Sequence, residues 1–125
     1  MFKHFSLKEF LVSPTATKLG INQCDYLTFS VVHNLELLCG RILEPLRLDF
    51  AEPIRITSGF RCAPLNVAVG GVPSSNHLKG LAADITPYNY SYGDLIRLFE
   101  LAHHTPYNEL ILYPDKHMFH ISLKV

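Results

Sequence analysis

The sequence predicts an α+β fold, a small antiparallel sheet packed against helices, and three observations support this class. Apolar residues make up 48% of the 125 residues, which is enough for one core of ordinary size. Two segments repeat apolar residues at intervals of three or four, the spacing of one helix face. Four short segments are typical of strands, and the last two are close enough to form a hairpin. We therefore expect a single domain over residues 1–125.

The first half of the chain contains the main predicted helix. Residues 6–19 are predicted to form a short helix and a loop, broken by Pro14. Asp25 precedes the strongest helical pattern and is predicted to be its N-cap. Pro45 is predicted to end or kink this helix near its C-terminal end. The apolar face of the helix consists of Leu27, Val31, Leu35, Leu38, Ile42 and Leu46.

The second half alternates short strands with helices. Ser91 and Asp94 have the spacing of a capping box, so a helix is predicted to begin there. A short turn over residues 114–116 joins the last two predicted strands, which indicates a hairpin. In chain order the predicted elements are a strand over 53–57, a short helix over 63–69, a loop over 72–79, a strand over 81–85, a helix over 91–102, and strands over 109–113 and 118–123.

The charge and composition exclude several classes of protein. The 11 Lys and Arg residues balance 11 Asp and Glu residues, whereas a nucleic-acid-binding domain is usually basic. The high apolar content excludes a mostly disordered chain. No apolar run approaches the roughly 18 residues of a membrane-spanning helix. We expect no nucleic-acid partner, no membrane insertion and a monomer.

The N-terminal residues and the cysteines predict the compartment of synthesis. The first ten residues contain no uninterrupted apolar stretch, so we expect no secretory signal peptide. Cys24, Cys39 and Cys62 are odd in number and lack C-x-x-C spacing. They are predicted to be reduced thiols of a protein made in the cytoplasm.

The densest group of chemically active residues lies between Ser75 and Asp84. His77 lies in a glycine-containing loop, and Asp84 follows inside an apolar stretch that indicates a partly buried carboxylate. A buried carboxylate needs a cation, a metal or several hydrogen-bond donors. Imidazole and carboxylate together suit zinc, and the third ligand would come from the C-terminal hairpin, which contains His117 and His120. The simpler alternative is an ordinary loop histidine and a carboxylate that caps a turn.

The order of several short motifs resembles the zinc murein peptidases. This family includes D-alanyl-D-alanine carboxypeptidases and dipeptidases, and phage endolysins that cut L-alanyl-D-glutamate bonds. The family pattern is S-G-[YF]-R, then S-x-H-x-x-G-x-A-x-D, then a C-terminal strand with a histidine. The resemblance covers residues 29–123 and implies a hedgehog/DD-peptidase-like fold. The matching segments are Ser58-Gly59-Phe60-Arg61, Leu65-Asn66, Val69-Gly70-Gly71, Ser75-Asn76-His77 and Gly80-x-Ala82-x-Asp84.

The resemblance implies a role for each matched residue. It makes His77, Asp84 and His120 the zinc ligands. It implies that Arg61 binds and polarises the substrate carbonyl or neutralises a carboxylate, for which its planar charged fork is suited. It implies that Ser75 hydrogen-bonds the substrate near the metal.

One departure from the family concerns the proton acceptor. The family usually has Glu or Asp three residues before the last zinc histidine, and here that residue is His117. Histidine can act as a general base near neutral pH, so His117 is the predicted catalytic base and Asp115 the alternative. In a regular strand His117 and His120 would face opposite sides. We therefore expect His117 to act only if an irregular strand start turns it towards the metal. The family's usual tryptophan is replaced by Met118.

The leading functional prediction is a zinc metallopeptidase that cleaves peptidoglycan stem peptides. Carboxypeptidase, dipeptidase and L,D-endopeptidase activities are all compatible with the motif. The enzyme would act at the bacterial cell wall or in the periplasm, and the compact chain favours a phage or prophage origin through lysis or the virion. The alternative is a binding or structural module of a virion or cell wall that keeps the fold without hydrolysis. A globular domain with unrelated histidines is the third possibility.

Overall fold

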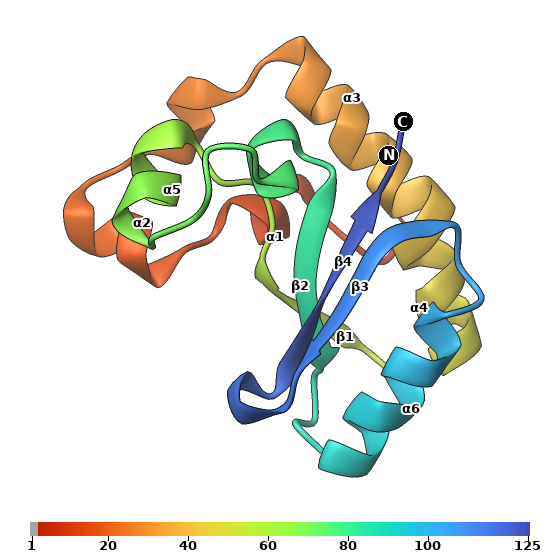
Figure 1. Ribbon diagram of the computed structural model, residues 1–125. Helices are drawn as coiled ribbons and strands as arrows, with labels where there is room; N and C mark the ends of the chain where they lie inside the picture. The colour runs from red at the N-terminus through yellow and green to blue at the C-terminus, as the bar shows by residue number, and fades with distance from the viewer. Residues whose placement is uncertain (1–2) are drawn as a thin grey trace.

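A four-stranded antiparallel sheet forms the centre of the fold (Figure 1). The computed structural model describes residues 3–125. The strand order is β1-β2-β4-β3, and each neighbouring pair is antiparallel. The strands and several helices together confirm the predicted α+β class. The strands are β1 (Ile54–Ser58), β2 (Ala82–Pro87), β3 (Tyr107–Tyr113) and β4 (Met118–Leu123).

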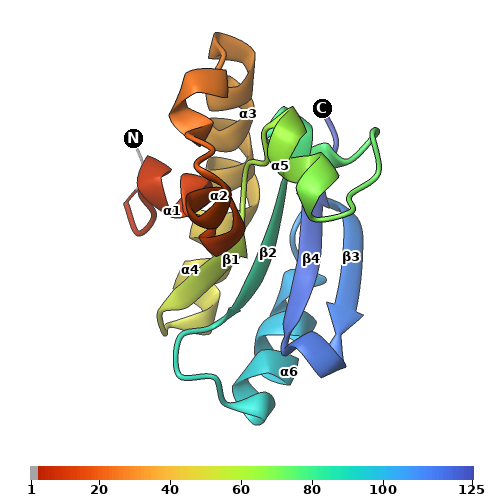
Figure 2. The same cartoon turned by 90° about the vertical axis from the view of Figure 1, so that its left-hand side faces the viewer.

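Helices lie on both sides of this sheet. Figures 1 and 2 show α3, α4 and α6 on one side, and α5 with its following loop on the other. The α-helices are α1 (Leu7–Leu11), α2 (Pro14–Leu19), α3 (Phe29–Leu38), α4 (Glu44–Phe50), α5 (Ala63–Ala68) and α6 (Tyr92–Ala102). The other helical turns are η1 (Gln23–Tyr26), the π-helical η2 (Cys39–Leu43), η3 (Asn76–Lys79) and η4 (Pro114–Lys116).

The hydrophobic core lies between the sheet and helices α3, α4 and α6. Alternate residues of a strand face opposite sides of a sheet. In β2, Ala83 and Ile85 are buried in the core, so Asp84 between them faces the opposite side. In β4, Phe119 and Ile121 are in the core, and His120 faces the opposite side. The face of the sheet away from the core therefore carries the polar side chains.

The main helix differs from the prediction at both ends. Its N-cap is Thr28, whose hydroxyl accepts a hydrogen bond from the Val31 backbone, whereas Asp25 lies in η1. Pro45 does not end the helix, which continues through α4 to Phe50. The π-helical turn η2 comes directly before α4, and the Glu44 N–H bonds to the Cys39 carbonyl. This wider turn accommodates a proline ring that would clash with a carbonyl in a regular α-helix.

The N-terminal segment forms two short helices where a helix and a loop are predicted, whereas α6 begins where it is predicted. Pro14 interrupts the N-terminal helical segment by starting α2, with Ser13 as the N-cap. Ser91 caps α6 by accepting a hydrogen bond from the Asp94 backbone. The capping box is incomplete because Asn89, not Asp94, accepts the hydrogen bond from the Ser91 N–H.

The three cysteine thiols are free in the structure. Cys24 is exposed, and Cys39 and Cys62 are buried. Burial, with a smaller contribution from the nearby Glu44 and Glu9 charges, raises the pKa of Cys39 to about 12, so this thiol stays protonated. Across the described residues, the helices are too short or too polar to cross a membrane.

The contact between His4 and Glu44 predicts a pH-dependent contribution to stability. The His4 backbone N–H donates to Glu44 Oε1 at 2.5 Å, and His4 Nδ1 lies 2.6 Å from Glu44 Oε2. Burial raises the pKa of Glu44, but these hydrogen bonds outweigh it and leave the pKa below its usual value. The folded state therefore binds this proton more weakly than the unfolded state does. The stabilisation is complete above the unfolded pKa and is lost as the pH falls through the lower, folded pKa.

We expect Glu44→Gln to lower the free energy of unfolding by about 0.5–1 kcal/mol at pH 7, since the pair is partly exposed. The difference from the parent should shrink as the pH falls through the lowered, folded pKa, because Glu44 then becomes protonated in both states. Urea unfolding of both proteins at several pH values measures this. An equal difference at pH 7 and pH 3 would contradict an ionised Glu44.

Candidate metal centre

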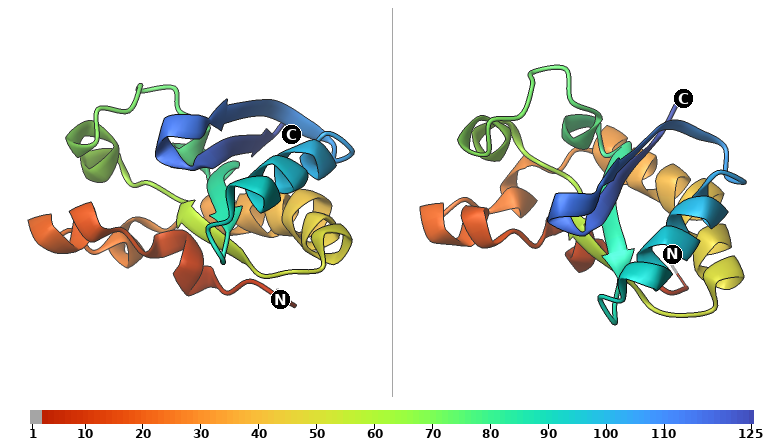
Figure 3. Two further views of the ribbon diagram at one scale, coloured as in Figure 1. Left: turned by 90° about the horizontal axis from the view of Figure 1, so that it is seen from below. Right: turned by 60° about the horizontal axis from the view of Figure 1, so that its bottom comes forward.

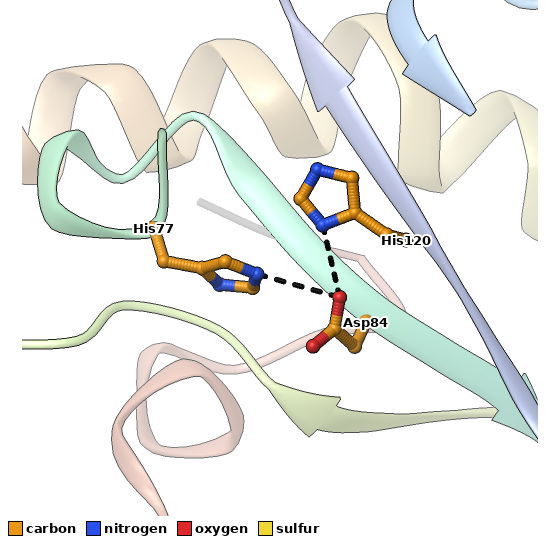
Figure 4. Close-up of side chains that lie close together, drawn as sticks. All are labelled: His77, Asp84 and His120. Carbon is orange, nitrogen blue, oxygen red and sulfur yellow. Dashed lines mark hydrogen bonds and ion pairs between the residues drawn. The ribbon is translucent and has the colours of Figure 1, made fainter. Parts of the chain in front are cut away.

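Three side chains from separate parts of the sequence meet on the polar face of the sheet. His77, Asp84 and His120 each offer one ligand atom, and these atoms all lie within 4.8 Å of one another. His77 Nε2 is 3.3 Å from Asp84 Oδ1, and His120 Nδ1 is 3.0 Å from the same oxygen. Figure 4 shows both rings pointing towards the Asp84 carboxylate. The structure thus brings together the three residues that the resemblance implies as zinc ligands.

The sheet register and one tight turn position these side chains. Asp84 and His120 are directly opposite each other in the β2–β4 pair. His77 comes from η3, which immediately precedes β2 and ends at Gly80. Gly80 has a φ of 76°, and a Cβ there would lie 2.8 Å from the Val31 carbonyl oxygen of α3. Only glycine therefore allows η3 to turn back so close to α3 and deliver His77 to the sheet.

A backbone carbonyl fixes the orientation and tautomer of His77. The ring is 2% exposed, and its Nδ1 lies 2.7 Å from the Gly59 carbonyl oxygen. A carbonyl oxygen can only accept a hydrogen bond, so Nδ1 carries a hydrogen and Nε2 is the nitrogen left to bind a metal when it is not protonated. Nε2 is the atom that faces Asp84. His77 is therefore oriented as a metal ligand, with its second nitrogen held by the protein.

The Glu109 carboxylate fixes the orientation of the His120 ring in the same way. His120 Nε2 lies 3.3 Å from Glu109 Oε1, while Nδ1 faces Asp84. Glu109 Oε1 also accepts hydrogen bonds from Asn76 Nδ2 and from the Ser122 hydroxyl, both at 3.1 Å. A hydrogen on Nε2 leaves Nδ1 free as a ligand atom. No sequence motif marks Glu109, so this contact was not predicted.

The charges in the group favour an ionised Asp84. Burial raises the pKa of Asp84, but hydrogen bonds and charge from His120 and His77 outweigh it and hold the pKa below its usual range. Burial lowers the pKa of His120, and the hydrogen bonds and charges of Asp84 and Glu109 outweigh that effect and raise it. Two imidazole nitrogens and one carboxylate oxygen form a donor set found in catalytic zinc sites, which leave a fourth position open. The residues present therefore fit a zinc ion.

A cavity of about 360 Å³ opens over the group and contains the predicted substrate-binding residues. The Arg61 Nη2 donates a hydrogen bond to the Ser75 hydroxyl oxygen at 3.2 Å. Burial lowers the pKa of Arg61, and the charge of Asp84 opposes this effect. Arg61 Nε is buried without a hydrogen-bond partner. The remaining lining residues are Val69, Gly70, Gly71 and Val72 from one side and Ile111, Tyr113, Lys116 and Met118 from the β3–β4 hairpin.

A larger cavity of about 450 Å³ lies between α1, α2 and η1. Its lining is mainly apolar and includes Leu7, Leu11 and Ile21, with neither imidazole nor carboxylate among its described lining residues. The chemistry of the chain is therefore concentrated at the smaller cavity.

The predicted proton acceptors lie elsewhere. His117 ends η4 in the left-handed conformation, with φ 54°, and its ring lies 5.6 Å from the Tyr92 ring and 6.4 Å from the Tyr90 ring. Neither His117 nor Asp115 is among the described residues that line the metal cavity. The irregular strand start does not bring His117 into the lining of the metal cavity, because His117 lies in the left-handed turn that precedes β4. Lys116 and Met118, the neighbours of His117, do face the cavity.

Comparison with known families agrees with this geometry. No curated protein matches the chain significantly. The family model described as Peptidase M15 matches residues 3–122, almost the whole chain. This family consists of zinc peptidases that act on the cell wall, and it is the family that the sequence motifs indicate. The chain belongs to the peptidase M15 family.

Proposed function

We propose that this chain is a zinc-dependent peptidase that hydrolyses amide bonds in peptidoglycan stem peptides. The observation that carries the proposal is the convergence of His77, Asp84 and His120 beneath a cavity that also contains Arg61 and Ser75. Membership of the peptidase M15 family supports it. The enzyme would act at the bacterial cell wall. Its phage or prophage origin and its monomeric state stay predictions.

In this proposal His77 Nε2, Asp84 Oδ1 and His120 Nδ1 hold the zinc ion, because these are the atoms that face one another. When bound, zinc supplies a Lewis acid that polarises a carbonyl and lowers the pKa of a coordinated water to about 7. The protein contributes the orientation of both rings, through the Gly59 carbonyl and the Glu109 carboxylate.

Arg61 and Ser75 would bind the substrate beside the metal. The Ser75 oxygen accepts hydrogen bonds from Arg61 Nη2 and from the His77 backbone N–H. Its own hydroxyl hydrogen is then free to donate to a substrate carbonyl or carboxylate. Arg61 adds a partly buried positive charge, which favours developing negative charge on the same substrate group.

We assign proton transfer to the hairpin side of the cavity. Apart from the metal group, Arg61 and Ser75, the described lining residues with exchangeable side-chain protons are Tyr113 and Lys116. The Lys116 ammonium lies 5.4 Å from the centre of the Tyr113 ring. A tyrosine hydroxyl or a lysine ammonium can give a proton to a leaving amine. His117 stays a prediction from the sequence, and its placement against Tyr90 and Tyr92 argues against this role.

Two matched variants test the assignment. We expect Tyr113→Phe to lower kcat on sugar-free stem peptides by about 10²-fold, because a positioned proton donor is removed. His117→Ala should keep kcat within about twofold, since its ring lies outside the cavity. Steady-state rates with zinc present measure both. The assignment is wrong if His117→Ala shows the larger loss.

A separate variant tests the hydrogen bond that orients His120. Glu109→Gln should weaken zinc binding by about 10–100-fold, because the His120 ring loses the carboxylate that holds its Nε2 hydrogen. Competition with a chromophoric chelator measures the affinity. The control is Glu100→Gln, which changes an exposed glutamate of α6. Parent affinity in Glu109→Gln would remove Glu109 from the metal centre.

The proposed function is tested by incubating the purified chain with stem pentapeptides, with added zinc or with a chelator, and analysing product masses. Loss of one terminal D-alanine identifies a carboxypeptidase, and loss of the terminal dipeptide a dipeptidase. A cut after the first L-alanine identifies an L,D-endopeptidase. We expect one product series that depends on zinc. If no product forms with any metal, the alternative is favoured, a binding module of a virion or cell wall. One observation supports that alternative: the described residues that line the cavity include no carboxylate besides Asp84.

A further inference from the structure

An exposed aromatic surface lies beside the metal cavity and has no part in the proposed mechanism. Tyr88, Tyr90 and Tyr92, here called the tyrosine surface, lie in the segment between β2 and α6 and at the first residue of α6. Their side chains are 52%, 54% and 52% exposed. Three neighbouring tyrosines with half their area open to solvent form a patch typical of an interaction site.

Hydrogen bonds hold this segment in place. The Tyr88 N–H donates to the Pro53 carbonyl at 3.0 Å, and the Tyr90 N–H donates to the Pro87 carbonyl at 3.1 Å. Tyr90 has a φ of 56°, an uncommon conformation for a tyrosine. The side chain of Asn89 bonds to both the Ser91 backbone and the Asp94 carboxylate. The rings are thus presented on a rigid support, which lowers the entropy cost of binding.

Arg55 adds an unpaired positive charge to the tyrosine surface. Its guanidinium carbon lies 4.2 Å from the centre of the Tyr88 ring and 5.3 Å from that of Tyr90. Within residues 3–125 no carboxylate lies at ion-pair distance from Arg55. A cation stacked on two rings and without an acidic partner keeps its outer N–H groups available for a ligand.

The tyrosine surface is continuous with the metal cavity through η4. His117 packs against Tyr90 and Tyr92, while its neighbours Lys116 and Met118 line the cavity. Figure 3 shows η4 near the N-terminal end of α6 when the molecule is seen from below. A ligand with one part in the cavity can therefore extend across η4 onto the rings.

We propose that the tyrosine surface and Arg55 bind the glycan strand to which the stem peptide is attached. Sugar rings have apolar faces that stack on tyrosine rings, and their hydroxyl, amide and carboxyl groups accept hydrogen bonds from arginine. The proposal rests on the proposed peptidoglycan substrate, which joins a peptide covalently to such a strand. The tyrosine surface selects stem peptides that are still attached to a glycan strand, and hydrolysis of the peptide takes place in the metal cavity.

The test uses oligomers of β-1,4-linked N-acetylglucosamine, which contain no peptide, and the full chain without zinc, so that hydrolysis plays no part. We expect NMR amide shifts to cluster at residues 88–92 and at Arg55. Tyr90→Ala and Tyr92→Ala should each weaken binding by about threefold to tenfold. Tyr26→Ala is the matched control, because Tyr26 is 46% exposed and lies in η1, away from this surface. It should bind the oligomer as the parent does.

The outcomes separate this proposal from the proposed function. Glycan binding at residues 88–92 without peptide cleavage would support the glycan surface and refute the peptidase. Zinc-dependent cleavage of sugar-free peptides with no oligomer binding, or with binding unchanged in both tyrosine variants, would overturn the glycan surface alone. Binding of a polyanion such as polyphosphate in place of the oligomer would also overturn it.

Discussion

His120→Ala should abolish stoichiometric zinc retention and lower peptide hydrolysis by about 10³-fold or more, because the metal loses a ligand and the cavity loses its Lewis acid. The His120 side chain is 15% exposed on the polar face of the sheet, and it lies outside the hydrophobic core. The variant should therefore stay folded. Metal analysis by mass spectrometry, with circular dichroism of the same sample, measures both effects.

His104→Ala is the matched control for this experiment. His104 is an exposed histidine just after α6, and it should keep one zinc per chain and the parent rate. Stoichiometric zinc in His120→Ala would remove His120 from the ligand set. A loss of helical signal in His120→Ala would show that the residue supports the fold, and Asp84→Asn would then replace it as the test.

Gly59→Ala should cause the largest loss of stability among small substitutions near the site. A Cβ at Gly59 would lie 2.7 Å from both the Cα and the carbonyl oxygen of Phe10, which are backbone atoms and cannot rotate away. The Phe60 N–H also donates to that Phe10 carbonyl at 2.8 Å, so α1 and the end of β1 would have to separate. We expect the free energy of unfolding to fall by about 3 kcal/mol, the upper part of the range for overpacking.

The same substitution should weaken zinc binding, because the Gly59 carbonyl accepts the His77 Nδ1 hydrogen. Gly40→Ala is the control, since a Cβ at this exposed helical position meets nothing within 4 Å. It should leave stability unchanged or raise it by up to about 1 kcal/mol. Urea unfolding with and without zinc measures both variants. If Gly59→Ala unfolds at the parent midpoint, the close approach of α1 has no energetic importance.

Local residue spacing predicted much of the fold, because strand segments, helix caps and apolar helix faces each depend on residues that are close in sequence. The alternation in residues 118–123 predicted β4 with its observed bounds, and Ser91 predicted the start of α6. The apolar face of the main helix predicted the buried residues Leu35, Leu38 and Ile42. The helix continues past Pro45 because of the π-helical turn before it, and that turn depends on tertiary packing, which a local pattern does not contain.

The metal group could be predicted because His77 and Asp84 lie in one dense motif and the family resemblance implies His120 as the third ligand. The contact of Glu109 with His120 depends on the register of β3 against β4, where Glu109 faces Ser122 after an irregularity that begins at Tyr107. Such a shift decides which side chains are neighbours across strands, and the sequence does not mark it. The position of His117 depends on the left-handed backbone that ends η4, and neither the family motif nor strand alternation predicts that turn.

Zinc-edge X-ray absorption of the zinc-loaded chain tests the metal centre most directly. The account predicts two imidazole nitrogens and one carboxylate oxygen at about 2.0–2.2 Å, with one further light atom in the fourth position. It also predicts that Asp84→Ala and His120→Ala change this spectrum and that His104→Ala does not. A sulfur ligand at about 2.3 Å, or a parent spectrum in Asp84→Ala and His120→Ala, would show that zinc binds elsewhere and would contradict the account.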